Sequence, residues 1–164
     1  MSFPLFISLF ILQRLSEIFI ARKNEYWLRK NGAIEYGRRH YSFIIILHSV
    51  FIASLIIEYI ERTEAHFDYV FFIIFVFLIF IKIWTITSLG KYWNTKIFRI
   101  PGSQPQRKGP YKFLKHPNYV IVVLEFIFVP LVFQLYYSAV IFSLLNAIML
   151  SIRIKEEDRI WSDQ

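Results

Sequence analysis

Long apolar blocks separated by short polar connections dominate the pattern of hydrophobic and polar positions along this chain. Five such blocks stand out, at Phe3–Ala21, Tyr41–Ile57, Tyr69–Leu89, Tyr119–Phe133 and Leu135–Ile152. A membrane-spanning helix needs roughly 17–25 apolar residues, and most of the blocks reach that length by themselves, without flanking residues. The pattern therefore predicts helices that cross a membrane.

The last two blocks need a separate argument, because only Gln134 interrupts them with a strongly polar side chain. A single helix through 119–152 would be about 50 Å long at ~1.5 Å per residue, which is too long for one crossing. Two spans that turn near Pro130–Tyr136 fit better. We therefore predict an all-α fold, a polytopic membrane helical bundle of five transmembrane helices in a single domain, 1–164.

The positive charges predict how the bundle is oriented. The connections in chain order hold six, one, seven and no Lys or Arg residues, and three more follow the last block. Because such residues favour the cytoplasmic side, we expect the N-terminus outside and the C-terminus in the cytoplasm. The net charge of +7 then reflects mostly this cytoplasmic bias, and it also favours attraction to membrane lipids of negative charge. Since the charges flank spans instead of lining one soluble face, we expect no nucleic-acid partner.

Several classes of chemistry are disfavoured by what the sequence lacks. There is no cysteine, so disulfides and thiolate catalysis are excluded. The four histidines lack metal-binding spacings, so we expect no metal site. The glycines do not form a dinucleotide-binding fingerprint, which argues against a soluble Rossmann-type methyltransferase. The first apolar block contains Arg14 and Glu17 and follows no basic segment, so a cleaved signal peptide is not expected.

Polar residues inside the spans are costly and need partners. We expect Arg14 and Glu17, three positions apart, to form a pair. Lys82 is expected to extend toward the cytoplasmic interface, and His48 to form a hydrogen bond between helices. Glu125 could line a substrate cavity or pair with another helix, and the sequence leaves both open.

Two polar patches carry the candidate chemistry: GPYKFLKHPNY at Gly109–Tyr119 and RIKEED at Arg153–Asp158. They flank the last two spans, so both return to one face of the membrane. Pro117 fits the first position of a helix, whose free amides suit an anionic group. Arg153 and Glu157 share a helix face. Together these groups suit a zwitterionic cofactor with a cationic centre, although each patch alone could be a solvated loop or tail.

The two patches resemble the isoprenylcysteine carboxyl methyltransferase family, whose members carry G-[PV]-Y and R-H-P-x-Y before one helix and R-x-x-x-E after the next. The similarity is close from about Gly90 to Glu157 and weaker for NGAIEYGRRHY at 31–41. It implies an integral membrane methyltransferase that uses S-adenosyl-L-methionine, with a cofactor-binding half at about 90–164. Lys115 replaces the usual arginine, and Ile121 the usual glycine.

The resemblance also implies roles for single residues. Arg153 would face the acceptor as the catalytic residue, and Glu157 would bind the cofactor. The other expected cofactor contacts are Ser103, Gln104, Pro105, Gln106, Tyr111, His116, Pro117, Asn118 and Tyr119.

We therefore interpret the chain as a methyltransferase that acts on an oxygen, a carboxylate or acidic hydroxyl, of a lipophilic small-molecule or lipidated acceptor. The bacterial plasma membrane is the expected location, with the site facing the cytoplasm. One alternative is a non-enzymatic membrane subunit, such as a transporter or assembly component. A nicotinamide-dependent membrane reductase of similar architecture ranks lower, because the tyrosine-rich tail of those enzymes is missing.

Overall fold

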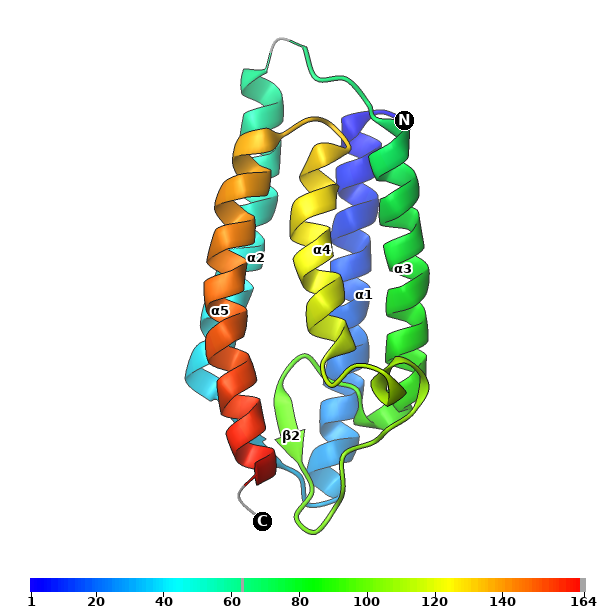
Figure 1. Ribbon diagram of the computed structural model, residues 1–164, viewed down its shortest axis with the longest axis vertical. Coiled ribbons are helices and arrows are strands. Elements are labelled where there is room, and N and C mark those ends of the chain that lie inside the picture. The colour runs from blue at the N-terminus through cyan, green and yellow to red at the C-terminus, as the bar shows by residue number, and fades with distance from the viewer. Residues whose placement is uncertain (63, 163–164) are drawn as a thin grey trace.

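The computed structural model describes residues 1–62 and 64–162, which form a bundle of long α-helices (Figure 1). The helices are α1 (Phe3–Lys30), α2 (Arg38–Glu61), α3 (Tyr69–Leu89), α4 (Pro117–Leu131) and α5 (Tyr136–Ser162). Short 3₁₀ turns η1 (Gly90–Tyr92) and η2 (Gly109–Lys112) lie between α3 and α4. The predicted all-α membrane bundle is confirmed.

A small antiparallel sheet joins two connections that are distant in sequence. Strand β1 (Ile34–Tyr36) follows α1, and β2 (Ile97–Arg99) lies between α3 and α4. Their register pairs Ile34 with Arg99 and Tyr36 with Ile97. The sheet therefore ties the N-terminal helix pair to the loop in which the sequence places the candidate chemistry.

The outer surface of the bundle is apolar, as lipid contact requires. Helices α1, α2, α3 and α5 are each long and apolar enough to cross a membrane. Large apolar side chains point outward along them; Phe19 is 72% exposed and Phe77 62% exposed. In water such surfaces would favour aggregation, whereas a bilayer solvates them. The chain is an integral membrane protein.

Helix α4 is much shorter than its neighbour, and this difference sets the depth of the site. Its 15 residues extend about 22 Å, whereas the 27 residues of α5 extend about 40 Å. The two helices meet in a turn at residues 132–135, where Gln134 takes a left-handed φ of 57°, which confirms the expected turn. Because both helices start from this turn, the other end of α4 meets α5 near Arg153.

Aromatic side chains fill the core near the N-terminal half of α1. The rings of Phe51 and Phe126 stack at 4.3 Å, and Phe6 and Phe10 pack edge-on against Phe75. All of these residues are buried. The core therefore lies toward the end of the bundle away from the polar patches.

Four charged side chains lie together between α1, α3 and α4, and three of them, Glu17, Lys82 and Glu125, are buried. The guanidinium of Arg14 lies 3.2 Å from Glu17 and 2.7 Å from Glu125, so the predicted Arg14–Glu17 pair is confirmed. Lys82 Nζ lies 2.6 Å from Glu125 and 3.1 Å from Glu17. The prediction that Lys82 extends to the interface is wrong, because two carboxylates meet it inside the bundle. Glu125 pairs with other helices, which resolves the alternatives left open by the sequence.

His48 also differs from its prediction. Its Nδ1 lies 2.9 Å from the carbonyl oxygen of Ile44, so the hydrogen bond is within α2 and not between helices. Between helices the imidazole instead packs edge-on against the ring of Phe126 at 5.0 Å.

Candidate active site

The two polar patches meet at one end of the bundle. Residues 90–116, the β1–β2 sheet and the C-terminal part of α5 lie together at the end opposite the α4–α5 turn (Figure 1). A cavity of about 420 Å³ opens there, lined by the segment 92–107, the η2 region, the start of α4, and Arg153 and Glu157. The prediction that the two patches lie together is confirmed; that this end faces the cytoplasm stays a prediction.

Gly109 fixes how the loop before α4 approaches α3. Its φ is +53°, and a Cβ built on it would lie 2.0 Å from Ser88 Oγ and 2.7 Å from Ser88 Cβ. Only glycine fits a positive φ and a contact this close. The next residue, Pro110, is buried, and Tyr111 lines the cavity. Burial, and secondarily the nearby carboxylate of Glu157, raises the pKa of the Tyr111 phenol, so the hydroxyl stays protonated.

The start of α4 has the geometry that its sequence predicts. His116 is the N-cap and Pro117 occupies the first helical position, where its missing N–H costs nothing. The side chain of Asn118 lines the cavity, and its Oδ1 is buried without a hydrogen-bond partner among the described residues. Buried amide oxygens usually have partners, so this acceptor is suited to a ligand.

A chain of hydrogen bonds joins the two polar patches through Tyr119. Arg153 Nε donates to the Tyr119 hydroxyl at 2.7 Å, and that hydroxyl donates to Glu157 Oε2 at 2.5 Å. The guanidinium also lies 5.3 Å from the centre of the Tyr119 ring. Arg153 is only 7% exposed. Its orientation is therefore set by α4 as well as by its own helix.

His116 lies beside this chain and is bound by α5. Its ring stacks on Tyr119 at 5.2 Å, and its Nδ1 lies 3.6 Å from Glu157 Oε2. Its Nε2 lies 3.1 Å from Asp158 Oδ1, which also pairs with Lys115 Nζ at 2.6 Å. Lys115 thus forms a surface ion pair between the two patches, a role that a lysine can fill as well as an arginine.

Most of the sequence-predicted site residues line this cavity. They are Ser103, Gln104, Gln106, Tyr111, His116, Asn118, Tyr119, Arg153, Glu157 and Pro105. Pro117 does not line the cavity; it is buried and is the first residue of α4. Glu156, the other glutamate of the C-terminal patch, lies on a different side, where its Cγ approaches Gly37.

Sequence reasoning missed the segment from Trp93 to Ile100, which forms one wall of the cavity. Trp93 is 1% exposed, and its Nε1 has no hydrogen-bond partner among the described residues. Asn94 and Lys96 lie in the same wall. The sequence offers one local signal, a tryptophan followed by polar residues three positions after Gly90, which caps α3, but this signal does not indicate their partners.

The comparisons with known proteins agree with this architecture. Residues 69–162 match the isoprenylcysteine carboxyl methyltransferase (ICMT) family. The chain belongs to this family, and so to a class of membrane methyltransferases.

Two relatives extend the likeness to nearly the whole chain. The Bacillus subtilis uncharacterized protein YpbQ is 43% identical over 159 residues, covering 96% of this chain and 95% of that protein. An uncharacterized Haemophilus influenzae protein is 30% identical over 149 residues, covering 88% and 86% respectively. No solved structure matches the chain.

Proposed function

We propose that this protein is an S-adenosylmethionine-dependent methyltransferase that methylates an oxygen of an anionic, lipophilic acceptor taken from the bilayer. The observation that carries the proposal is the hydrogen-bonded chain Arg153–Tyr119–Glu157 inside the cavity. In this chain, a cation suited to an anionic acceptor and a carboxylate suited to the cofactor bond to the same phenol hydroxyl.

The free polar groups of the cavity fit the proposed cofactor. Its amino-acid end needs hydrogen-bond acceptors for an ammonium, which Asn118 Oδ1 and Glu157 supply. Its carboxylate and adenine need donors, for which Trp93 Nε1 and the backbone N–H of Asn118 at the start of α4 are suited. The aromatic rings of Tyr111, His116 and Tyr119 suit the sulfonium.

The residues around Arg153 suit transfer to an oxygen that is already ionised. The cofactor would supply an electrophilic methyl group, which forms a bond to the acceptor oxygen as its bond to sulfur breaks. Arg153 would hold the acceptor anion and lower the barrier by alignment, an effect that reaches several kcal/mol in well-oriented sites. A carboxylate or acidic hydroxyl that is already ionised needs no general base. Tyr111, which lines the same cavity, has a raised pKa and stays protonated, so it would not act as one.

The depth of the site supports a lipid acceptor. Since α4 extends only about 22 Å from the α4–α5 turn, its N-terminus lies short of the ~30 Å needed to cross a hydrocarbon core. His116 and Tyr119 would then lie at the level of the lipid chains near one interface. An acceptor could keep its tail in the bilayer, where each buried CH₂ contributes about 0.8 kcal/mol.

The side of the membrane follows from the basic connections. The seven Lys and Arg residues between α3 and α4 surround the cavity end, so we place this end in the cytoplasm. A plasma membrane of a bacterium is the proposed location, because both relatives come from bacteria.

The proposal is tested by radiolabelled methyl transfer into the organic extract of membranes. Arg153→Ala should lower turnover at least about 100-fold while S-adenosylhomocysteine affinity stays within about twofold. Arg153→Lys should recover only part, because a point charge replaces a planar fork. Tyr137→Phe, at an exposed position on the same helix, is the control. Label confined to the aqueous fraction, or normal turnover in Arg153→Ala, would contradict the proposal.

A further inference from the structure

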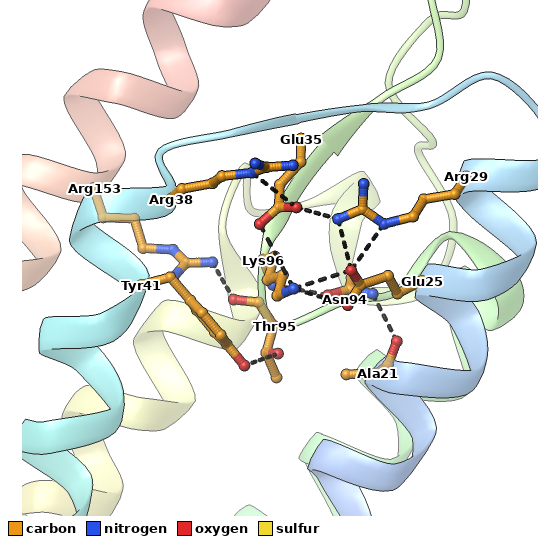
Figure 2. A network of polar contacts seen from close by, with 10 residues as sticks. All are labelled: Ala21, Glu25, Arg29, Glu35, Arg38, Tyr41, Asn94, Thr95, Lys96 and Arg153. Carbon is orange, nitrogen blue, oxygen red and sulfur yellow. Dashed lines mark hydrogen bonds and ion pairs between the residues drawn. The ribbon is translucent and has the colours of Figure 1, made fainter.

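The segment Trp93–Lys96 is held in place by α1 (Figure 2). Asn24 Nδ2 donates to the carbonyl of Trp93 at 2.7 Å, and Asn94 Nδ2 donates to the carbonyl of Ala21 at 2.8 Å. The side chain of Asn94 also accepts a bond from the backbone N–H of Lys96 at 2.9 Å. The backbone of the segment therefore has a fixed position against α1.

Lys96 adds a charged anchor between α1 and β1. Its Nζ lies 3.0 and 2.9 Å from the two oxygens of Glu25 and 3.6 Å from Glu35. Arg29 binds the same two carboxylates and Arg38 pairs with Glu35 at 3.3 Å, so five charged side chains form one network (Figure 2). The side chain of Glu35 is only 6% exposed, so the network is partly shielded from water and less screened than a surface pair.

Thr95, at the centre of this segment, contacts both α2 and α5. Its backbone carbonyl accepts a bond from Arg153 Nη2, and its Oγ1 lies 3.1 Å from the hydroxyl of Tyr41. The ring of Tyr41 also lies under Lys96 Nζ at 5.5 Å. Figure 2 shows Tyr41 and Arg153 reaching Thr95 from two different helices.

These contacts leave one part of the guanidinium available. An arginine has five N–H donors. In Arg153, Nε bonds to Tyr119 and Nη2 to Thr95, whereas Nη1 has no partner among residues 1–62 and 64–162. The bound edge fixes the plane of the group, and the free nitrogen belongs to a side chain that lines the cavity.

We propose that Tyr41 and Thr95 are positioning residues that hold the Arg153 guanidinium with Nη1 presented to the anionic acceptor, an inference that rests on the proposed function. It gives the N-terminal helices a part in the chemistry. The family match covers only residues 69–162, whereas the bacterial relatives match nearly the whole chain.

The first test needs no acceptor. Arginine Nε–H signals are recorded by ¹⁵N NMR of the full chain in detergent, and Arg153 is assigned from the signal lost in Arg153→Lys. Tyr41→Phe keeps the ring beneath Lys96 Nζ and removes only the hydroxyl. Thr95→Val keeps the backbone carbonyl and removes Oγ1. Each should speed exchange of the Arg153 Nε–H about 3- to 10-fold, the range allowed by one lost hydrogen bond.

The double variant and a control test whether both substitutions act through the Tyr41–Thr95 hydrogen bond. In the double variant Tyr41→Phe/Thr95→Val, the Arg153 Nε–H should exchange no faster than in either single variant, because both substitutions remove the same hydrogen bond. Tyr26→Phe, at a position 74% exposed on α1, should change nothing. Unchanged Arg153 exchange in both single variants would overturn the inference. So would faster exchange at every arginine together with a lower melting temperature, because that pattern indicates general loosening.

The second test measures methyl transfer with the same variants. Tyr41→Phe and Thr95→Val should lower kcat/KM for the lipid acceptor about tenfold, with S-adenosylhomocysteine affinity within twofold of the wild type. If Arg153 loosens and the wild type transfers no methyl group, the proposed function fails and the positioning role stands. If the wild type transfers methyl and neither variant affects Arg153 exchange or kcat/KM, the positioning role fails alone.

Discussion

At the scale of single residues, the charges inside the bundle are balanced, two of each sign, between three helices; they are Arg14, Glu17, Lys82 and Glu125. A charge inside a membrane is tolerated when its partners remove the cost of leaving water. Glu125 bonds to both cations and is fully buried. Its loss would therefore leave an unbalanced positive charge inside the bundle.

Replacing Glu125 alone should be much worse than replacing the Lys82–Glu125 pair. Glu125→Leu is expected to destabilise the bundle by about 3–5 kcal/mol, because Lys82 and Arg14 lose a shared carboxylate. The double variant Lys82→Leu/Glu125→Leu leaves Arg14 paired with Glu17 and should lose less than Glu125→Leu. Unfolding in mixed detergent measures both. A double variant as unstable as the sum of its singles would contradict this account.

The residues of the site divide clearly into those that sequence reasoning predicted and those it missed. Arg153, Glu157 and the HPNY motif were predicted because a charged or proline-started helix end is a local pattern. Trp93 and Thr95 were missed, because their importance comes from bonds to Asn24 and Arg153, which are distant in the chain. No local pattern encodes such partners.

At the scale of elements, the loop that carries η2 depends on the contact of Gly109 with Ser88 on α3. Gly102 offers a matched comparison, since it also has a positive φ, +75°, but a Cβ there would meet nothing within 4 Å. Gly102→Ala should cost only the backbone strain, about 1–2 kcal/mol of stability. Gly109→Ala adds a clash and should displace Tyr111 from the cavity.

The measurement is S-adenosylhomocysteine affinity. Gly109→Ala should weaken it at least about tenfold, since small displacements of positioning groups have large effects, and Gly102→Ala should change it less than twofold. Adding Ser88→Gly to Gly109→Ala should recover part of the loss. Equal effects of the two alanine substitutions would show that positive φ, and not the Ser88 contact, limits the loop.

The helices themselves followed from the apolar blocks, and the turn at 132–135 followed from Pro130 and Gln134. The pairing of β1 with β2 did not, because each strand has only three residues and the partners come from separate connections. The partners of Lys82 were also missed: inside a bundle, the nearest carboxylate competes with the interface, and the sequence does not give that distance.

At the scale of the whole molecule, the Lys and Arg bias predicts that the α2–α3 connection and the α3–α4 loop lie on opposite sides of the membrane. Reporter fusions after Glu61 and after Gln104 should therefore give opposite readouts, with the second in the cytoplasm. Cysteine labelling suits the same test, because the chain has no native cysteine. Equal accessibility at both points would overturn the five-span arrangement.

The central claim is that the cavity between the two polar patches binds S-adenosylmethionine, and calorimetric titration of the purified protein with S-adenosylhomocysteine tests it most directly. We expect one micromolar site. Glu157→Ala should weaken it by about 1.5–3 kcal/mol, the loss of a hydrogen bond to a charged group, whereas Glu61→Ala, beyond the opposite end of the bundle, should leave it unchanged. Absence of binding heat, or equal affinity in the wild type and Glu157→Ala, would contradict the account.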